Sequence, residues 1–355
     1  MGELPNSRKR DIKTRKFLGE KVDMVKIIFE HTQPTIDAML VTISNRKKQP
    51  PRRYLGASSL GQECERALWY SFRHTNDTEI PAANLLAIED GFAQEKVAIK
   101  RLRAIKGIKL LTGSAKKQIG FVSHDGHYKG HVDGIITGIL ESPATPHIWE
   151  HKSVNLKKFA SLRKIITQNE EKKCLQLWDA TYFAQAQIYM DKMGLTRHFL
   201  TVSSPGGRDY ISLRTEIDQI VCDRLEKKAT RIIDAPSPPP RAFLSPNYIC
   251  NWCPHSNTCW SGEKITANKN CRTCLSSTPH ENGSFVCELK KITIGPRLEK
   301  KGCGEHLFIP DLFKEYEQTA VEMHSKDGSV KSILYRDKMG RVVANGKGSG
   351  VLSEV

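Results

Sequence analysis

Two short apolar segments joined by a proline-containing loop constrain the fold most strongly. Residues 130–136 and 148–152 are rich in β-branched and aromatic side chains and are flanked by Gly or Pro, which predicts the two strands of a hairpin. Side chains alternate along a strand, so Glu150 and Lys152 share one face. In such a hairpin Asp133 would lie beside Glu150. Two carboxylates and an ammonium would suit a hard cation and a phosphate, whereas a solvated strand face is the simpler alternative.

Length and charge limit the class of protein. The 355 residues suffice for one large domain with appendages or for two domains. The 55 Lys and Arg against 39 Asp and Glu give a net charge of +16, which favours nucleic acid as the partner over an acidic membrane surface. The chain has no apolar run of about 20 residues, so no membrane association is expected. Its first residues lack the apolar core of a secretory signal, which predicts a cytoplasmic protein.

Helical periodicity predicts two helices that each carry a polar residue on an apolar face. The first spans residues 83–106, and its expected buried face consists of Ile88, Phe92, Ile99 and Leu102. Glu95 falls on that side, where it needs either a salt-bridge partner or a metal. The second spans residues 174–193 and aligns Trp178, Tyr182, Gln185 and Tyr189. Gln185 is unexpected there, because a buried amide needs hydrogen-bond partners.

The remaining segments complete a mixed sheet with helices against it. Ser58 or Ser59 is expected to cap a helix that begins near Leu60. Proline-rich residues 236–240 predict a stiff spacer that closes the domain. The other expected elements are strands at 117–122, 198–203 and 210–215, helices at 22–43 (interrupted by Pro34) and 216–233, and a C-terminal hairpin of 331–336 with 341–344.

Seven of the ten cysteines lie between residues 250 and 303, which indicates metal sites before disulfides in a chain without an export signal. In a first group, Cys250, Cys253 and Cys259 can surround one centre but lack a fourth cysteine of their own. A tetrahedral zinc could take His255 as its fourth ligand, and a four-iron cluster would need a cysteine from elsewhere, such as Cys64.

A second group offers five ligands for a four-coordinate zinc, namely Cys271, Cys274, Cys287, Cys303 and His306. The four cysteines are favoured, with His306 as the substitute for Cys287 or Cys303. The role expected for this zinc is structural, because a segment with so few large apolar residues cannot build much of a core.

The ordered motifs resemble the RecB-like branch of the PD-(D/E)XK nucleases. The resemblance is to its iron–sulfur members, such as the AddB nuclease domain, exonuclease V and the CRISPR-associated RecB-like exonucleases. In chain order the matching motifs are Gly91-x-x-x-Glu95, Gly130-x-x-Asp133, Glu150-x-Lys152 and Gln185-x-x-x-Tyr189. The proline that often precedes the aspartate of the second motif is absent.

Cysteines extend the resemblance. Cys64 together with Cys250, Cys253 and Cys259 resembles the ligand set of the family's [4Fe–4S] clasp, with zinc as the alternative metal. The likeness covers about residues 55–262, so the second cysteine group lies outside it. That group resembles appendages of phage-encoded nucleases, which would place the protein in the cytoplasm of a bacterial host.

The resemblance implies an α/β fold of the restriction-endonuclease type, a mixed sheet flanked by helices, with an iron–sulfur clasp and a small zinc-binding appendage. It implies three regions: a basic, helical segment at 1–54, the nuclease domain at 55–262, and a zinc-binding segment with a hairpin at 263–355.

The implied activity is Mg²⁺- or Mn²⁺-dependent hydrolysis of DNA, at single-stranded ends, in replication, recombination or repair and alongside proteins of those processes. The implied metal ligands are Glu95, Asp133, Glu150 and the carbonyl of His151. Lys152 would orient water or neutralise charge, and Gln185 and Tyr189 would position the strand. Two other readings remain: a non-catalytic, zinc-containing nucleic-acid-binding protein, and a structure-selective endonuclease on the same fold.

Overall fold

The computed structural model describes residues 33–45, 50–77, 80–114, 117–260, 267–313, 317–321, 332–336 and 342–346. Contacts divide the chain into two compact units, Met1–Arg46 and Lys47–Val355. In the first unit the described residues form helix α2 (Pro34–Ser44), and proline suits its first turn because the N–H that proline lacks would have no helical partner there. The helix expected over 22–43 is therefore confirmed from Pro34 onward, and its earlier residues lie outside the described part.

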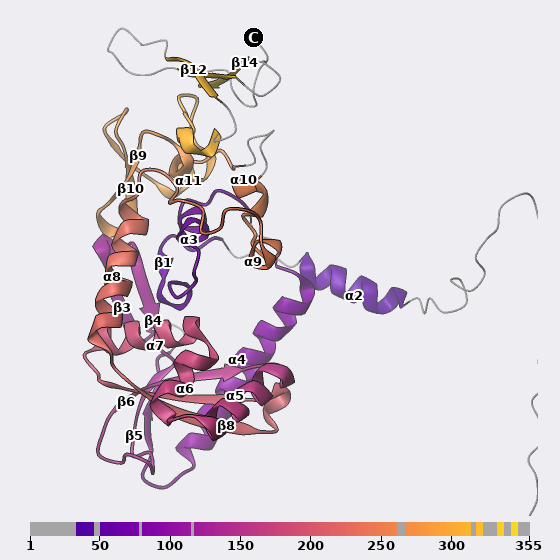
Figure 1. Ribbon diagram of the computed structural model, residues 1–355, viewed down its shortest axis with the longest axis vertical. Coiled ribbons are helices and arrows are strands. Elements are labelled where there is room, and N and C mark those ends of the chain that lie inside the picture. The colour runs from indigo at the N-terminus through magenta and orange to yellow at the C-terminus, as the bar shows by residue number, and fades with distance from the viewer. Residues whose placement is uncertain are drawn as a thin grey trace, which may run out of the picture. The chain divides into compact units, whose positions relative to one another are not determined.

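The largest sheet among the described residues has five strands, of which β5, β6 and β8 are labelled in Figure 1, and it is mixed, as the sequence predicted. Its strands lie in the order β2 (Lys109–Leu111), β5 (Gly134–Thr137), β6 (His147–Ser153), β7 (Arg197–Ser203) and β8 (Tyr210–Glu216). Strands β6 and β7 run parallel, and the other neighbours run antiparallel. Parallel neighbours need a long crossover. Here it is made of α5 (Leu156–Gln168), α6 (Glu171–Trp178) and α7 (Ala180–Met193).

Helices cover both faces of this sheet. Trp149 of β6 shares a hydrophobic cluster with Ala98 of α4 (Ala82–Arg103). The preceding residue, Ile148, belongs to the larger core cluster together with Ile188 of α7. Because successive side chains of a strand point to opposite faces, α4 and α7 lie on opposite sides of β6 (Figure 1).

A second sheet changes how the opening hairpin is built. Its strands lie in the order β1 (Leu55–Gly56), β4 (Tyr128–His131) and β3 (Gly120–Ser123). The single strand expected over 130–136 is wrong, because the chain leaves this sheet after β4 and enters the five-stranded sheet at β5. The amide of Val132 still donates to the carbonyl of Ile119, directly before β3 of the three-stranded sheet (3.0 Å). The amide of Asp133 donates instead to the carboxylate of Glu150 (3.4 Å). The hairpin of β5 with β6 is confirmed.

The helix expected from Leu60 begins later. Residues Ala57–Ser59 form a 3₁₀ turn, η1, and the helix α3 spans Glu65–Phe72, directly after Cys64. The hydroxyl of Ser59 donates to the carbonyl of Gly56 (2.9 Å), and no side chain caps α3 by a hydrogen bond. The predicted serine cap is therefore wrong, and Cys64 occupies the N-cap position.

The single helix expected over 174–193 is broken at Asp179. This residue is extended (φ −154°), and its carboxylate accepts from the amide of Tyr182 at 2.9 Å, which caps α7. Side-chain capping at an N-terminus satisfies an amide that has no helical partner. The break therefore lets α6 pack along β8 while α7 turns onto the inner strands.

The buried face of α4 differs from the expected one. Ile88 is 46% exposed and Phe92 is 63% exposed, whereas Gln94 and Ala98 are buried. Ile99 and Leu102 do pack against the cluster of Ala98 and Trp149. The prediction was right for the C-terminal half of the helix and wrong for the N-terminal half.

Helix α3 is enclosed by segments that lie far along the chain, after residue 233. The helix α8 (Gln219–Asp234) leads into residues 235–247, and the carbonyl of Ala235 accepts from the side chains of Trp69 (2.9 Å) and Arg73 (3.1 Å). Pro238 is buried. Residues 236–240 therefore pack on α3 and do not act as the predicted spacer. Two short helices follow, α9 (Tyr248–Asn251) and α10 (Ser256–Trp260).

The C-terminal part belongs to the same compact unit. Phe285 contacts Phe72 of α3 with ring centroids 5.8 Å apart, within one core cluster. The domain boundary expected at 262/263 stays a prediction. Its elements are η4 (Cys271–Thr273), β9 (Ser277–His280), η5 (Glu281–Gly283), β10 (Ser284–Cys287), β11 (Ile292–Ile294), α11 (Pro296–Lys301) and η6 (Pro310–Phe313).

The predicted C-terminal hairpin is present. Strands β13 (Ser332–Arg336) and β14 (Val342–Gly346) pair antiparallel, and β12 (Glu317–Val321) pairs with the other edge of β13. The turn between β13 and β14 lies outside the described residues. Elsewhere, β3, β7, β8 and α8 match the remaining expectations to within a few residues.

Candidate active site

The end of β6 carries the first two site residues. Glu150 and Lys152 point to the face that α7 covers, and the Lys152 ammonium donates to Glu150 Oε2 at 2.9 Å. Glu150 is 2% exposed. A charge this deep needs a partner to offset lost hydration. The predicted common face of the two side chains is confirmed.

Asp133 reaches the same place because β5 ends one residue short of it. Its amide donates to Glu150 Oε1 (3.4 Å), and its Oδ2 accepts from the amide of His151 (2.9 Å). Beyond Gly134 no strand pairs with this edge of β6 in the described part of the chain, so the carboxylate takes the position of a ladder partner. The predicted juxtaposition of Asp133 and Glu150 is therefore present.

Helix α7 adds an amide and a phenol. Gln185 Nε2 donates to Glu150 Oε2 (3.3 Å) and lies 3.2 Å from the Tyr189 hydroxyl. Both residues are buried. Gly130 makes room for this contact, because a Cβ there would lie 2.6 Å from a ring carbon of Tyr189. The buried amide that was unexpected in the sequence thus has its partners in the site.

Glu95 approaches from α4 on the other side of the sheet. Burial and, to a smaller extent, the nearby Asp133 carboxylate raise its pKa to about 7. Lys152 and Lys96 act in the opposite direction. Glu95 therefore belongs to the same electrostatic cluster as Asp133 and Lys152.

The site holds more negative charge than its lysine neutralises. Burial raises the pKa of Glu150 to about 8, with Asp133 adding to the effect. Burial also raises the pKa of Asp133 against the lowering influence of Lys152 and the His151 amide. Burial alone would lower the pKa of Lys152, but the Glu150 and Asp133 carboxylates outweigh it and raise it. Three crowded, poorly hydrated carboxylates are a donor set that suits a divalent cation.

His151 can offer this cluster its carbonyl but not its ring. Nδ1 lies 3.0 Å from Thr201 Oγ1, and Nε2 lies 3.3 Å from Ser203 Oγ, so both nitrogens are engaged. The amide and carbonyl of one residue leave a strand on the same side. Since the His151 amide faces Asp133, its carbonyl also leaves β6 on the side beyond the end of β5.

Sequence reasoning missed a second contact between α4 and β6. The Ser153 hydroxyl donates to Asp90 Oδ2 (2.8 Å), and Gln94 Nε2 donates to Asp90 Oδ1 (3.3 Å). These bonds attach the N-terminal half of α4 beside the site residues of β6. The spacing of Asp90 and Gln94 by four residues on one helical face was the available indication.

The first cysteine group comes together around α3. Burial raises the pKa of Cys253, and Cys64, Cys259 and Cys250 raise it further as near neighbours. His255 is disfavoured as a ligand because its Nε2 lies 2.8 Å from Ser71 Oγ and its Nδ1 lies 3.0 Å from Asn76 Oδ1. Cys64 is therefore the better fourth member of the group.

The second group also converges. One small cavity is lined by all five predicted ligands, Cys271, Cys274, Cys287, Cys303 and His306. Within the ranges that the structure describes, no three His, Cys, Asp or Glu side chains already stand in a coordination geometry. Metal ligation by the carboxylates and by both cysteine groups therefore stays a prediction. No helix among the described residues is long and apolar enough to cross a membrane.

Comparison with known proteins gives limited information. No family model matches the chain, and no curated protein matches it. An alkaline exonuclease from Laribacter hongkongensis is similar at 16% identity over 55% of this chain and 90% of that chain, with a TM-score of 0.35. A phage-related exonuclease from Haemophilus somnus is similar at 13% identity over 50% of this chain and 91% of that chain, also with a TM-score of 0.35. Such scores are too low to assign a fold, so the function is inferred from the site itself.

Proposed function

We propose that the protein is a Mg²⁺- or Mn²⁺-dependent DNA exonuclease that hydrolyses phosphodiester bonds at single-stranded ends. One observation carries the proposal. Glu95, Asp133 and Glu150 come from α4, the β4–β5 junction and β6, yet they meet beside one lysine with their pKa values raised. Desolvated carboxylates gathered from distant parts of a chain destabilise the fold unless a cation offsets their charge.

The ligands of this cation would be the three carboxylates and the carbonyl of His151. A bound Mg²⁺ or Mn²⁺ would acidify the attacking water and offset charge that builds on the phosphate. Glu150 is fixed for this role by Lys152 and Gln185, which both donate to its Oε2. Asp133 is fixed by the His151 amide. The protein therefore orients its acidic groups before substrate arrives.

Lys152 would act on the phosphate. Its ammonium stays charged because the neighbouring carboxylates raise its pKa, and it lies 5.3 Å from the centre of the Tyr182 ring, which restricts its motion. A fixed positive charge can orient the water or stabilise the growing negative charge on phosphate oxygens. Gln185 and Tyr189 would place the scissile strand through Glu150 and Lys152.

The residues around α3 fit a [4Fe–4S] cluster held by Cys64, Cys250, Cys253 and Cys259. Four thiols of one neighbourhood are present, and the nearby imidazole of His255 is already engaged. The role of this cluster would be structural, joining the residue that precedes α3 to segments far along the chain. Anaerobically purified protein should be brown and absorb near about 400 nm, whereas colourless protein with zinc in place of iron would contradict the iron assignment.

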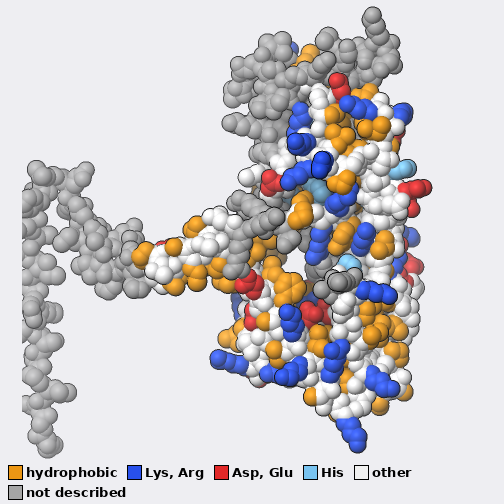
Figure 2. Space-filling view, turned by 180° about the vertical axis from the view of Figure 1, so that it is seen from behind, with side chains coloured by type: hydrophobic (Ala, Val, Ile, Leu, Met, Phe, Trp, Pro, Cys, Tyr) orange, Lys and Arg blue, Asp and Glu red, His pale blue; other side chains and the backbone are white. Residues whose placement is uncertain are grey.

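Nucleic acid as the substrate is supported by charge. The net charge is +16. Figure 2 shows Lys and Arg side chains scattered over the face it draws and not gathered in one patch. Dispersed positive charge attracts a phosphate backbone without regard to base sequence, which agrees with an enzyme that degrades strands of any sequence.

A cleavage assay with matched substrates tests the proposal. Linear single-stranded DNA should be degraded in Mg²⁺ or Mn²⁺, and circular single-stranded DNA of the same sequence should survive. Cutting of the circle would mean an endonuclease. Salt-dependent binding without metal-dependent cleavage of any single- or double-stranded DNA would mean a non-catalytic binding protein. Full activity in Glu150→Ala or Lys152→Ala would contradict the assigned site.

A further inference from the structure

The second cysteine group lies outside the proposed nuclease site and needs its own explanation. We infer that Cys271, Cys274, Cys287 and Cys303 bind one structural Zn²⁺, that His306 stays outside the coordination sphere, and that Arg272 makes this centre a clamp on helix α3. The inference does not depend on the nuclease proposal.

The four thiols share one cavity and come from three elements. Cys271 and Cys274 flank η4, Cys287 ends β10, and Cys303 follows α11. Cys271 and Cys274 are 7% and 8% exposed. The four thiols therefore line one enclosed space, and four thiolates are the usual ligands of a closed structural zinc site.

The loop that carries the first two cysteines is already shaped. Asn270 Oδ1 accepts from the amides of Arg272 (2.8 Å) and Thr273 (3.2 Å), and Thr273 Oγ1 lies 3.2 Å from the amide of Asn270. This reciprocal capping fixes the turn of η4. Coordination therefore needs side-chain rotation of the cysteines and no refolding of this loop.

His306 supports that loop. Its Nε2 lies 3.0 Å from the carbonyl of Asn270 and 3.3 Å from Thr273 Oγ1. A carbonyl can only accept, so Nε2 carries the hydrogen. Four thiols complete a tetrahedral site, and the imidazole is left to hold η4.

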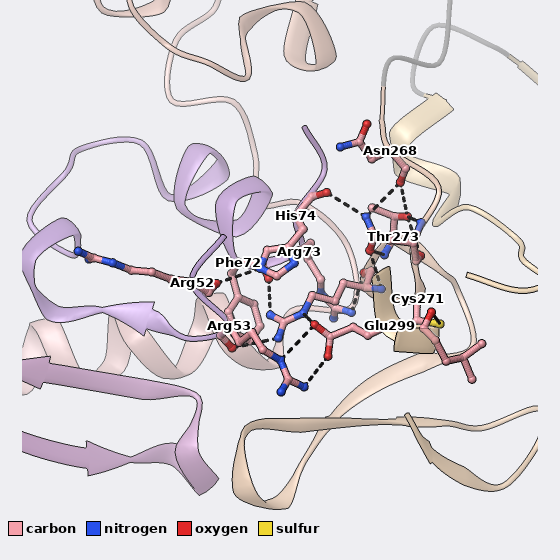
Figure 3. A network of polar contacts seen from close by, with 12 residues as sticks. Arg52, Arg53, Phe72, Arg73, His74, Asn268, Cys271, Thr273 and Glu299 are labelled. Atoms are coloured by element: carbon pink, nitrogen blue, oxygen red, sulfur yellow. Dashed lines mark hydrogen bonds and ion pairs between the residues drawn. The ribbon is translucent and has the colours of Figure 1, made fainter. Parts of the chain in front are cut away.

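Arg272, between the two buried cysteines, connects this centre to the rest of the molecule. Its partners Arg53, Phe72 and Glu299 are labelled in Figure 3. Arg272 is 0% exposed. Its guanidinium donates to Glu299 Oε1 (2.8 Å), to the carbonyl of Phe72 (2.8 Å) and to the carbonyl of Arg53 (3.0 Å). Glu299 is in turn bound by Arg53 at 2.7 Å. A buried guanidinium is tolerated only while all of these partners stay in place.

The position of Arg272 gives the zinc a mechanical consequence. Phe72 is the last residue of α3, and Cys64 precedes its first. A bound zinc would fix the conformation of η4, which contains Arg272. Arg272 in turn binds the C-terminal end of α3, the end opposite to Cys64. Loss of zinc should therefore loosen α3 and, through it, the first cysteine group, while the carboxylates on β6 keep their local contacts.

Metal analysis of the full-length protein tests the ligands. We expect one zinc per chain, retained in Glu150→Gln, in Cys174→Ser and in Cys222→Ser, whose cysteines belong to neither group. Cys303→Ser and Cys287→Ser should lose it, and His306→Ala should keep it. Iron in place of zinc, zinc loss in His306→Ala, or no metal at this group in the parent protein would overturn the assignment.

A spectroscopic measurement tests the ligands without cysteine variants, which could lose the metal merely because they fail to fold. Protein loaded with Co²⁺ at this site should give the same visible spectrum in the parent and in His306→Ala, because four sulfurs surround the ion in both. A spectral change on removing the imidazole would mean that nitrogen is a ligand and would overturn the four-cysteine site.

Hydrogen exchange tests the clamp. Chelation of the zinc, or Arg272→Lys, should raise amide exchange in α3 at least about tenfold, because a lysine cannot bind Phe72, Arg53 and Glu299 at once. Glu281→Gln, an exposed substitution in the same segment and away from the cysteine cavity, should change nothing. Unaltered exchange in α3 after complete zinc removal would overturn the clamp.

Discussion

Glu150 combines three properties that seldom occur together in a residue kept only for stability. It is 2% exposed, it lies beside a second carboxylate, and its pKa is raised to about 8 by burial and by Asp133. A buried ion pair kept for structure would instead lower the pKa of its acid. The ionised Glu150 side chain therefore lowers the stability of the metal-free protein, which is typical of a group kept for binding or catalysis.

Replacement of this charge should separate activity from stability. Glu150→Gln keeps the shape of the side chain but removes a metal ligand, so nuclease activity should fall on the order of 10²–10³-fold. The metal-free variant should melt no lower than the parent at pH 8.5, because a crowded negative charge is gone. Activity assays and thermal melts of the same preparations check both parts.

The matched control is Glu141→Gln, which removes an exposed carboxylate from the loop before β6. It should leave activity and melting temperature close to those of the parent. A large activity loss in this control, or full activity in Glu150→Gln, would contradict the assigned role.

The raised pKa values of Glu95 and Glu150 give a pH dependence of known sign. In the metal-free protein the folded state holds protons that the unfolded state releases near pH 4–5, so the free energy of unfolding should decrease as pH rises from about 5 through 8. Mn²⁺ must displace those protons. Its affinity should therefore rise about tenfold per pH unit for each proton released and level off above about pH 8.

Calorimetric titration with Mn²⁺ at several pH values measures the pH dependence of Mn²⁺ affinity. Thermal melts without metal measure the pH dependence of stability. In Glu150→Gln both slopes should become shallower. A Mn²⁺ affinity that is constant between pH 6 and 8 would be incompatible with carboxylates whose protons compete with the metal.

The site was predictable where local rules apply. Strand alternation placed Glu150 with Lys152, and the hairpin placed Asp133 beside them. Helical spacing put Gln185 and Tyr189 on one face, and the implausibility of a buried amide marked Gln185. The contact of Asp90 with Ser153 joins two elements through tertiary packing, and the four-residue spacing of Asp90 and Gln94 indicated only that these two share a helical face.

Asp179 is the element boundary on which the site depends. It ends α6, caps α7 through the amide of Tyr182 and binds Lys158. Its position sets the rotation of α7 and hence the approach of Gln185 to Glu150.

Removing this cap should destabilise the fold and the site together. Asp179→Ala should lower the free energy of unfolding by about 1 kcal/mol and reduce cleavage, because the first turn of α7 loses a partner for its amide. Asp179→Asn retains a capping oxygen and should recover most of the stability. Denaturant unfolding and cleavage rates measure both, and equal behaviour of the two variants would refute the capping role.

Helix α4 shows why periodicity alone misplaced a buried face. Apolar Ile88 and Phe92 match a helical stripe, but this part of α4 contacts β6 through a polar group, Asp90, to which the buried Gln94 also donates. Hydrophobic spacing identifies the buried side only where apolar contacts decide the packing. Near a polar site that condition fails, so the prediction held for Ile99 and Leu102 and failed earlier in the helix.

The charge of the molecule predicts how salt affects binding. Affinity for single-stranded DNA should fall as salt rises, with a slope of log affinity against log salt near −0.7 for each phosphate contacted. Lys157 and Lys164 are exposed on α5, between β6 and α7 in the chain. The double variant Lys157→Gln, Lys164→Gln should make the slope shallower by about 1.4 if both contact phosphates.

The control replaces Lys290 and Lys300, which are exposed in the cysteine-rich part. Binding titrations at several salt concentrations should give this variant the slope of the parent. Identical slopes for both double variants would show that α5 does not line the path of the DNA.

The order of predicted strands and helices was enough to predict the mixed sheet and its helical crossover. It was not enough to predict that the chain passes from one sheet to another between β4 and β5. Val132 and Asp133 continue an apolar, β-prone run, and the run divides because Asp133 bonds to Glu150, a residue 17 positions away. Likewise, proline-rich residues resembled a spacer until their contacts with α3 were seen. Long-range partners decided both cases.

The enclosure of α3 by later segments has a consequence for synthesis. Trp69, Tyr70 and Phe72 are almost fully buried, yet their covering residues extend to Arg272, 200 positions after Phe72. At about 5–20 residues per second, a ribosome needs on the order of 10–40 s to supply them. During that interval an aromatic surface stays open, and the nascent chain gains all the proposed site residues, from Glu95 to Tyr189, before its cover arrives. A message cut short after α8 should therefore yield protein that has the proposed site residues but aggregates.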